Sequence, residues 1–301
     1  MMAPSSSRAT VRRRRRRTRR IRRVVVLVVA LSVLGSWLVF SRPATSTPVP
    51  VAASAAASAS TSAAAPAVDP DAVLGAAVSG LAGHFAVAVT DPAAGTGASW
   101  GEDSFVTASI VKVDILAALL LRSGGELTDD RRSAAALMIE QSDNDAATAL
   151  FEAAGGASGL DEANAAFGLT ATVAGTDGYW GLTSTTAADQ VRLLRAVFTE
   201  DSPLTPDSRA YLRQLMGQVV DGQDWGVSAA DQGGAAQLKN GWLPRTSTGL
   251  WVVNSIGRID YGGRELLVSV VSDGSATLED GIALVESVAS AAVRAFASTH
   301  G

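Results

Sequence analysis

The sequence of 301 residues contains no cysteine. A disulfide framework, a thiolate zinc site, a cysteine nucleophile and a lipid-modified cysteine are therefore excluded. Histidine is almost as scarce, since the chain has only His84 and His300. A histidine metal cluster is therefore not expected, and a Ser-His-Asp triad would have to use His84. We expect neither a metal nor a cofactor.

Lysine is the third scarce residue. The chain has two lysines, Lys112 in TASIVKVDIL and Lys239 in QLKNGW, against 23 arginines. Arginine stays protonated in proteins, whereas burial and a second cation lower the pKa of a lysine, so that it can act as a base. This difference gives a chemical reason to keep lysine at these positions while arginine serves elsewhere.

The net charge of −4 conceals two opposite parts of the chain. Residues 1–42 hold 12 arginines and no acid. The remainder holds 11 arginines and two lysines against 29 acids, a net charge of −16. An acidic body disfavours nucleic acid as a partner.

The N-terminal part has three predicted segments. Residues 1–23, which include RRRRRRTRRIRR, are a predicted cytoplasmic segment. Residues 24–40 (VVVLVVALSVLGSWLVF) would span about 25 Å as a helix, against roughly 30 Å of hydrocarbon core. They indicate an uncleaved membrane anchor in preference to a cleaved signal, and either would export the rest. Residues 41–68 form an Ala/Ser/Thr/Pro linker.

Residues 69–301 are predicted to form the folded domain. Asp69 and Pro70 have the residue types of a helix start, and HFAVAVTD alternates as a strand over 84–91. Further helices are expected over 109–122, 130–140, 144–153, 159–166, 186–199, 206–217 and 277–297, and further strands over 235–243, 249–257 and 264–272. This order predicts an α/β sandwich whose antiparallel sheet is built from both ends of the chain around a helical insertion.

Three short motifs carry the candidate chemistry. In Ser109-Ile110-Val111-Lys112, a helix starting near Ser109 would place hydroxyl and amine on one face, where the amine can take the hydroxyl proton. The second motif is Ser142-Asp143-Asn144 and the third is Lys239-Asn240-Gly241. Each also has an ordinary explanation: a helix cap with a solvated lysine, a plain N-cap, and a strand with an exposed lysine.

S-x-x-K, S-D-N and K-x-G in this order resemble the motifs of the penicillin-recognising serine hydrolases, and class A β-lactamases in particular. The resemblance covers about residues 70–297. It implies a serine β-lactamase-like sandwich, with a five-stranded antiparallel sheet, flanking N- and C-terminal helices and an all-helical subdomain. Ser109 would be the acylated nucleophile, Lys112 its base and Ser142 a proton relay. Lys239 would supply positive charge.

The resemblance also implies the groups that hold the substrate. Asn144 would hold the substrate amide, and Asn240 and Gly241 belong to the substrate-binding strand. The oxyanion hole would be formed by the backbone N–H groups of Ser109 and Trp242.

Two departures from the family pattern matter. Asn240 stands where family members have Thr or Ser, so a hydroxyl for the substrate carboxylate is missing; Arg245 with Thr246, Ser247 or Thr248 could replace it. The loop over 173–182 (VAGTDGYWGL) has no glutamate to activate the deacylating water. Its only acid, Asp177, is either a turn residue or a replacement base. We therefore expect β-lactams to acylate the protein and the adduct to hydrolyse slowly.

The sequence leaves more than one function open. The favoured one is an exported, membrane-tethered serine hydrolase acting on cyclic amides, a β-lactamase that consumes β-lactam antibiotics or a D,D-peptidase acting on peptidoglycan peptides. The domain would lie on the extracellular side, or be secreted if the N-terminal segment is cleaved, and we expect a monomer. The alternative is a module that binds cell-wall fragments or β-lactams with little or no catalysis.

Overall fold

The computed structural model describes residues 69–299. The predicted segments 1–23, 24–40 and 41–68 lie outside the described residues. The helices are α1 (Pro70–Val78), α2 (Val111–Arg122), α3 (Asp129–Glu140), α4 (Asn144–Ala153), α5 (Gly156–Phe167), α6 (Ala187–Phe198), α7 (Pro206–Met216) and α8 (Leu278–Ser298), with short 3-10 turns η1 (Ala108–Ile110), η2 (Trp180–Leu182) and η3 (Val227–Ala230). The strands are β1 (His84–Asp91), β2 (Thr96–Trp100), β3 (Phe105–Val106), β4 (Ser184–Thr185), β5 (Gln237–Pro244), β6 (Trp251–Tyr261) and β7 (Arg264–Asp273).

The main sheet has five strands in the order β2-β1-β7-β6-β5. Every neighbouring pair is antiparallel, so the prediction of a five-stranded antiparallel sheet from both ends of the chain is confirmed. β2 was not among the predicted strands. Its sequence, TGASW, is short, lies at the sheet edge and has only one buried residue, so the alternation that marks a strand is missing.

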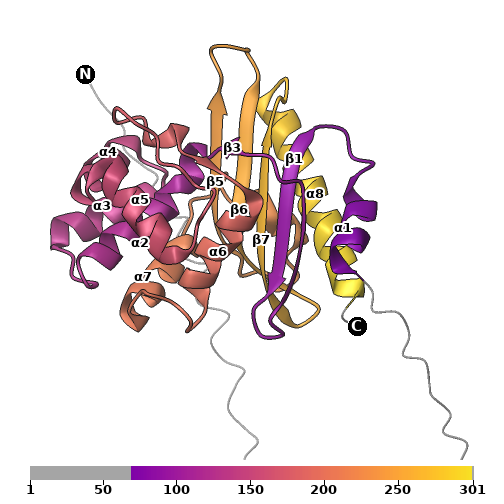
Figure 1. The fold of residues 1–301 in the computed structure, drawn as a ribbon, viewed down its shortest axis with the longest axis horizontal. Helices are drawn as coiled ribbons and strands as arrows, with labels where there is room; N and C mark the ends of the chain where they lie inside the picture. The colour runs from indigo at the N-terminus through magenta and orange to yellow at the C-terminus, as the bar shows by residue number, and fades with distance from the viewer. Residues whose placement is uncertain (1–68, 300–301) are drawn as a thin grey trace, which may run out of the picture. The chain divides into compact units, whose positions relative to one another are not determined.

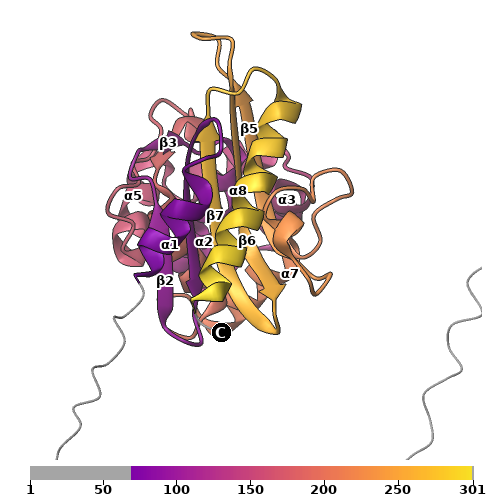
Figure 2. The same cartoon turned by 90° about the vertical axis from the view of Figure 1, so that its right-hand side faces the viewer.

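Helices cover both faces of this sheet (Figures 1 and 2). α1 and α8 lie on one face, where Leu74, Val285 and Phe296 belong to one apolar core. The other face meets α6, and the helical subdomain of α2–α5 and α7 lies beyond it, with Ile115 and Leu194 in a second core. The sheet, covered by helices on both faces, confirms the predicted sandwich with a helical insertion.

Helix starts are fixed by local capping. Asp69 accepts a hydrogen bond from Asp71 N at 3.0 Å, with Pro70 in the first turn of α1. Thr277 caps α8 by accepting from Asp280 N at 3.0 Å. Such caps satisfy backbone donors that a helix leaves unpaired, which explains why the predicted starts of these two helices match the observed ones closely.

Within residues 69–299, α8 is the one helix long and apolar enough to cross a membrane. Its apolar face is instead packed in the fold, because Val285, Val288, Ala292 and Phe296 are fully buried. α8 is therefore the core helix of the sandwich, and its composition carries little weight for membrane attachment.

α2 runs through the centre of the helical subdomain and buries a carboxyl group. Asp114 is fully buried, and the amide nitrogen of Asn164, turned toward it, donates to its two oxygens at 2.9 and 3.1 Å. Burial first, and then the charges of Asp161 and Asp189, raise the pKa of Asp114 well above its ordinary value. Folding therefore favours the protonated form of this carboxyl group.

Asp114→Asn is expected to stabilise the protein at neutral pH. Because the folded-state pKa is raised, the wild-type free energy of unfolding falls as pH rises above about 4, by up to ~1.4 kcal/mol per pH unit, until the folded-state pKa is passed. An amide at this position has no proton to lose and can pair with Asn164. Urea unfolding at several pH values checks this. The free energy of unfolding of the variant, relative to that of the wild type, should rise from about pH 4 upward. A difference that does not change with pH would contradict the prediction.

Candidate active site

The turn that carries Ser109 is held between the sheet and the helical subdomain. Asn254 of β6 donates from Nδ2 to Val106 O at 2.8 Å and to Thr107 O at 2.9 Å. Ala108 follows with φ of 47°, a left-handed conformation that is costly for a residue with a side chain. Within residues 69–299 the Ser109 hydroxyl has no hydrogen-bond partner, and it is only partly buried. A strained turn thus presents a free hydroxyl at the start of α2.

Lys112 lies in the first turn of α2 with 0% of its surface exposed. Its amine donates to Ser142 O at 2.6 Å, to Ser142 Oγ at 3.1 Å and to Asn144 Oδ1 at 2.7 Å. All three acceptors come from the second motif. The explanation that Lys112 is merely solvated is therefore excluded.

In the second motif, the middle residue caps α4, which leaves the other two side chains free to face Lys112. Asp143 is the N-cap of α4 and accepts from Ala146 N at 2.8 Å. Ser142 adopts φ of 59°, again left-handed, and so turns its side chain toward the lysine. The helix start and the candidate site are thus built by different side chains of the same motif.

Lys239 reaches the same hydroxyl from β5. It is also 0% exposed, and its amine donates to Ser142 Oγ at 3.1 Å and to Asn240 O at 3.0 Å. The structure therefore brings together two amines and a hydroxyl from three separate parts of the chain. We call Lys112, Ser142 and Lys239 the lysine cluster.

Both amines of the lysine cluster have lowered pKa values. Burial lowers the pKa of Lys112 to about 8, an effect that the charge of Asp143 partly opposes. Burial lowers the pKa of Lys239 to about 7, and the positive charge of Lys112 adds to the effect. Because both amines contact Ser142 Oγ, they titrate as a pair and a proton can pass between them through this hydroxyl. One neutral amine is therefore available near pH 7.

Gly241 explains the glycine of the third motif. A Cβ atom at this position would lie 2.7 Å from both Ser109 N and Ile110 N, and 2.8 Å from Thr107 O. Only glycine lets β5 approach the backbone of the Ser109 turn this closely. The close approach fixes the strand relative to the candidate nucleophile.

The backbone of β5 also turns donors toward the site. Arg245 N donates to Leu250 O at 2.8 Å, so odd-numbered positions of β5 form the hydrogen-bonded pairs with β6. Even-numbered positions turn their peptide groups to the open edge, as Asn240 O does in accepting from Lys239. Trp242 belongs to the even-numbered set. Its N–H therefore points to the open edge of β5.

The side chain of Asn240 points away from the lysine cluster. Its Nδ2 donates to Gln223 O at 3.0 Å and to Trp225 O at 2.8 Å, and the side chain is fully buried. Only the backbone of Asn240 contacts the cluster, through its bond with Lys239. The side chain anchors the loop before η3, so it does not replace the hydroxyl that the family motif carries.

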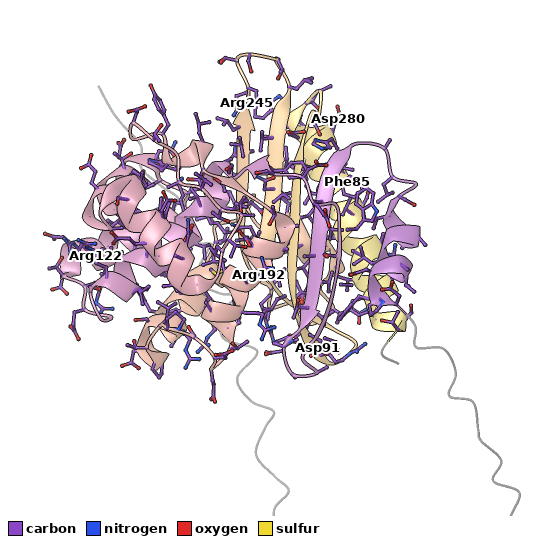
Figure 3. The ribbon with its side chains drawn as sticks, in the orientation of Figure 1. Phe85, Asp91, Arg122, Arg192, Arg245 and Asp280 are labelled. Atoms are coloured by element: carbon purple, nitrogen blue, oxygen red, sulfur yellow. The ribbon has the colours of Figure 1, made fainter. Side chains whose placement is uncertain are left out.

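Arg245, Ser247 and Thr248, which could have replaced that hydroxyl, lie elsewhere. Arg245 is six residues beyond Lys239, about 20 Å of extended chain, just past the far end of β5 (Figure 3). Arg245, Ser247 and Thr248 line a pocket of about 320 Å³ that no residue of the lysine cluster lines. The expectation that these residues replace the missing hydroxyl is not supported by their positions.

The 173–182 loop contains Asp177 and an unexpected aromatic residue. Asp177 has φ of 55° in an exposed turn, and its carboxylate accepts from Thr176 Oγ1 at 3.3 Å, which fits the turn explanation. Trp180 instead faces the site, with its ring centroid 5.0 Å from Lys112 Nζ. Sequence analysis did not select Trp180. The signal was a tryptophan in a short, glycine-rich loop beside the expected site.

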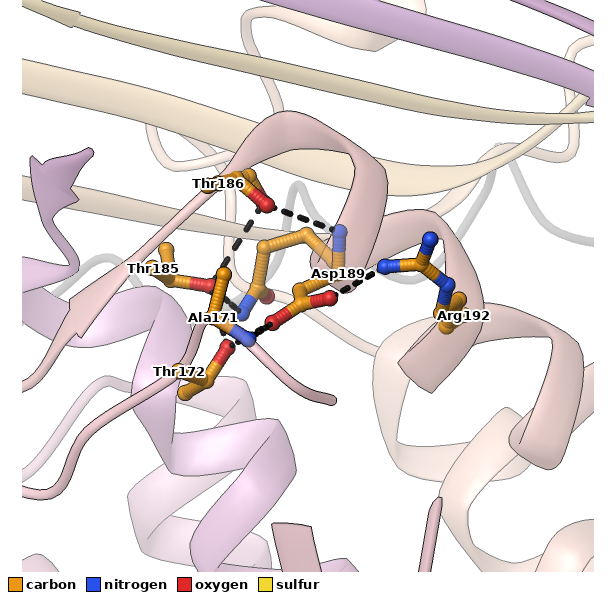
Figure 4. A network of polar contacts seen from close by, with 7 residues as sticks. Ala171, Thr172, Thr185, Thr186, Asp189 and Arg192 are labelled. Atoms are coloured by element: carbon orange, nitrogen blue, oxygen red, sulfur yellow. Dashed lines mark hydrogen bonds and ion pairs between the residues drawn. The ribbon is translucent and has the colours of Figure 1, made fainter. Parts of the chain in front are cut away.

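A buried polar network anchors both ends of this loop (Figure 4). Asp189 of α6 accepts from Ala171 N and from Thr172 Oγ1, both at 2.8 Å, and pairs with Arg192. Thr172 Oγ1 lies 2.8 Å from Thr185 Oγ1, which joins the two sides. The loop between these ends is therefore closed and fixed.

His84 does not complete a triad. Its ring nitrogens lie 2.6 Å from Asp273 Oδ1 and 3.4 Å from Asp103 Oδ2, and these carboxylates raise its pKa. Its polar partners within residues 69–299 do not include Ser109. In the same part of the chain, no group of three metal-ligating side chains is arranged to hold an ion.

The fold and this arrangement define the class of the protein: a serine hydrolase fold of the class A β-lactamase type. A class A β-lactamase from Bacteroides cellulosilyticus is 17% identical, with a TM-score of 0.65 over 77% of this chain and 99% of that one. An ancestral class A β-lactamase is 23% identical, with a TM-score of 0.62 over 75% and 100%. A mutant of PBP-A, solved as an acyl-enzyme complex with penicillin G, is 21% identical, with a TM-score of 0.61 over 76% and 96%. The predicted fold class is confirmed.

The family follows from the sequence itself. Residues 130–296, more than half of the chain, match the model of the Beta-lactamase enzyme family (Beta-lactamase2). The chain therefore belongs to this family, and the predicted resemblance is confirmed. The matched stretch holds Ser142, Asn144 and Lys239 and begins after Ser109. A search of curated proteins finds no match.

Proposed function

We propose that this protein is a serine hydrolase that forms an acyl-enzyme at Ser109 with β-lactams or D-alanyl peptides. The observation that carries the proposal is the lysine cluster, in which two fully buried amines share one hydroxyl. A binding module has less need of a desolvated amine that can lose its proton. The buried lysines therefore favour catalysis over the non-catalytic alternative.

Acylation would proceed as follows. The neutral amine of Lys112 takes the proton of Ser109 Oγ as this oxygen attacks the carbonyl carbon. The backbone N–H groups of Ser109 and Trp242 stabilise the negative oxygen of the tetrahedral intermediate. The C–N bond then breaks, and Ser142 gives its proton to the leaving nitrogen. Ser142 is reprotonated from a lysine amine, so the cluster ends with the protons it began with.

Asn144 and Lys239 would position the substrate. Asn144 is exposed at the start of α4 while its Oδ1 accepts from Lys112, so its amide nitrogen can hold a substrate carbonyl. Lys239 gives the site positive charge for a substrate carboxylate. Gly241 and the backbone of Asn240 form the edge of β5 against which the substrate would lie.

Deacylation would be slow, because the 173–182 loop has no glutamate to activate water. Asp177 is its only acid and lies in an exposed turn. Rapid penicillin turnover by the wild type would contradict slow deacylation. Its loss in Asp177→Ala would then identify Asp177 as a replacement base, and its persistence would exclude that role.

The setting of the domain is proposed from the sequence. The arginine-rich residues 1–23 and the apolar residues 24–40 would tether a monomeric domain on the extracellular side, or direct its secretion if they are cleaved. Both placements bring the site to β-lactams and to peptidoglycan peptides, which lie outside the cell membrane.

Labelling with a fluorescent penicillin, followed by intact mass, tests the proposal. We expect one adduct per molecule, on Ser109, that persists long after free penicillin is removed. Ser109→Ala should give no adduct, because it removes the hydroxyl that is proposed to attack the carbonyl carbon. The absence of any adduct on the wild-type protein would instead favour the binding module.

A further inference from the structure

The ring of Trp180 covers the amine of Lys112. The ring centroid lies 5.0 Å from Nζ, within the range of a cation–π contact. The indole N–H donates to Thr148 Oγ1 at 3.1 Å, and Thr148 Oγ1 donates to Asn144 O at 3.1 Å. The ring is therefore tied to α4, the helix whose first residue also accepts from Lys112.

Three polar groups already contact this amine. Ser142 O, Ser142 Oγ and Asn144 Oδ1 accept its hydrogen bonds, and α2 buries its stem. An amine can activate water only when water reaches it. The Trp180 ring lies on a side of the amine that none of these polar groups covers, where water could otherwise reach it.

The loop holds the ring in this position. Besides the Asp189 network at its ends, Ala174 N donates to Asp161 Oδ1 at 2.8 Å and Gly175 N donates to Thr183 Oγ1 at 3.0 Å. A Cβ atom at Gly175 would lie 2.1 Å from Tyr179 O, so the loop folds back tightly on itself. The covering position of Trp180 thus follows from a closed, anchored loop.

We propose that Trp180 is a water-excluding residue that prolongs the life of the acyl-enzyme at Ser109. The inference rests on the proposed function and adds a cause of slow deacylation beyond the missing glutamate. In the reaction that Trp180 would hinder, a water oxygen attacks the acyl carbon while Lys112 takes its proton. The bond from the carbon to Ser109 Oγ then breaks, and the proton returns from Lys112 to this oxygen.

The experiment measures acylation and adduct decay separately, by intact mass with penicillin G. Trp180→Ala should speed adduct decay at least about 10-fold, since water gains access to a base, while the acylation rate changes less than about 3-fold. Trp180→Phe keeps a ring over the amine and should hold the lifetime within about 3-fold of wild type. Thr148→Val releases the indole N–H and should speed decay by a smaller factor, which serves if Trp180→Ala does not fold.

Tyr179→Ala is the matched control, because Tyr179 is the neighbouring aromatic residue, 65% exposed. Its adduct should decay at the wild-type rate. If the substitutions merely loosen the loop, the adduct of Tyr179→Ala should also decay faster, or Trp180→Ala should acylate more slowly. Either result would overturn the proposal. So would unchanged decay in folded Trp180→Ala and Thr148→Val. If wild type forms no adduct, the proposed function itself fails; if wild type forms one and Trp180→Ala decays no faster, only this inference fails.

Discussion

Lys112→Arg is expected to lower the second-order rate constant of acylation by about 1,000-fold, within the range that general-base catalysis contributes. The guanidinium group keeps its proton at every relevant pH, so it cannot accept the proton of Ser109 Oγ. It would also place a permanent charge beside Lys239, which shares Ser142 Oγ with Lys112. Stopped-flow measurement with a chromogenic cephalosporin, or timed intact mass with penicillin G, gives the rate constant.

The same helix offers a matched control. Arg122 lies at the other end of α2, mostly exposed, with Glu162 Oε2 3.7 Å from its Nη1. Arg122→Lys makes the reverse exchange at a position where only charge matters, and it should leave the acylation rate unchanged. Acylation of folded Lys112→Arg within about 5-fold of wild type would show that Lys112 is not the base.

Gly241→Ala is expected to have the second largest effect. The added methyl group would lie 2.7 Å from Ser109 N and Ile110 N, and these atoms are backbone, which cannot rotate away. Either β5 or the Ser109 turn must shift, and displacement of reacting groups by about 1 Å can cost about 100-fold in rate. We expect acylation to fall by about this factor and the free energy of unfolding to fall by roughly 1–3 kcal/mol.

Gly80→Ala is the control for this substitution, because a Cβ atom there meets no atom within 4 Å. It should leave both acylation and thermal unfolding unchanged. A Gly241→Ala protein that acylates and melts like wild type would mean that the close approach of β5 to the Ser109 turn is not required.

Sequence patterns predicted those parts of the fold that depend on neighbouring residues. The strand over 84–91 and the helix over 144–153 match β1 and α4 at both ends. Their signals are local: a short apolar run in β1, which is buried on both faces, and at α4 a capping residue, Asp143, that accepts a hydrogen bond from three residues ahead. The helix predicted over 109–122 begins instead with the 3-10 turn η1, because the left-handed Ala108 starts the Ser109 turn.

Long-range features could be predicted only through the family motifs. Lys239 and Ser142 are 97 residues apart, and no periodicity in the sequence brings them together. The direction of the Asn240 side chain depends on which face of β5 meets the loop before η3. The position of Trp180 depends on the network around Asp189, whose partners include Thr172 and Arg192, residues that nothing in the sequence marks out. These features arise from tertiary packing, which local patterns do not encode.

The central claim is that a neutral, buried amine activates Ser109, and the pH dependence of acylation tests it most directly. The pKa values of Lys112 and Lys239 are lowered to about 8 and about 7, so the neutral form appears as pH rises through this window. The acylation rate constant, followed as the Ser109 adduct, should therefore rise between about pH 6 and 8 and level off above it. A rate that is flat from acid to alkaline pH, or that still climbs toward about pH 10, where an ordinary lysine titrates, would contradict the account.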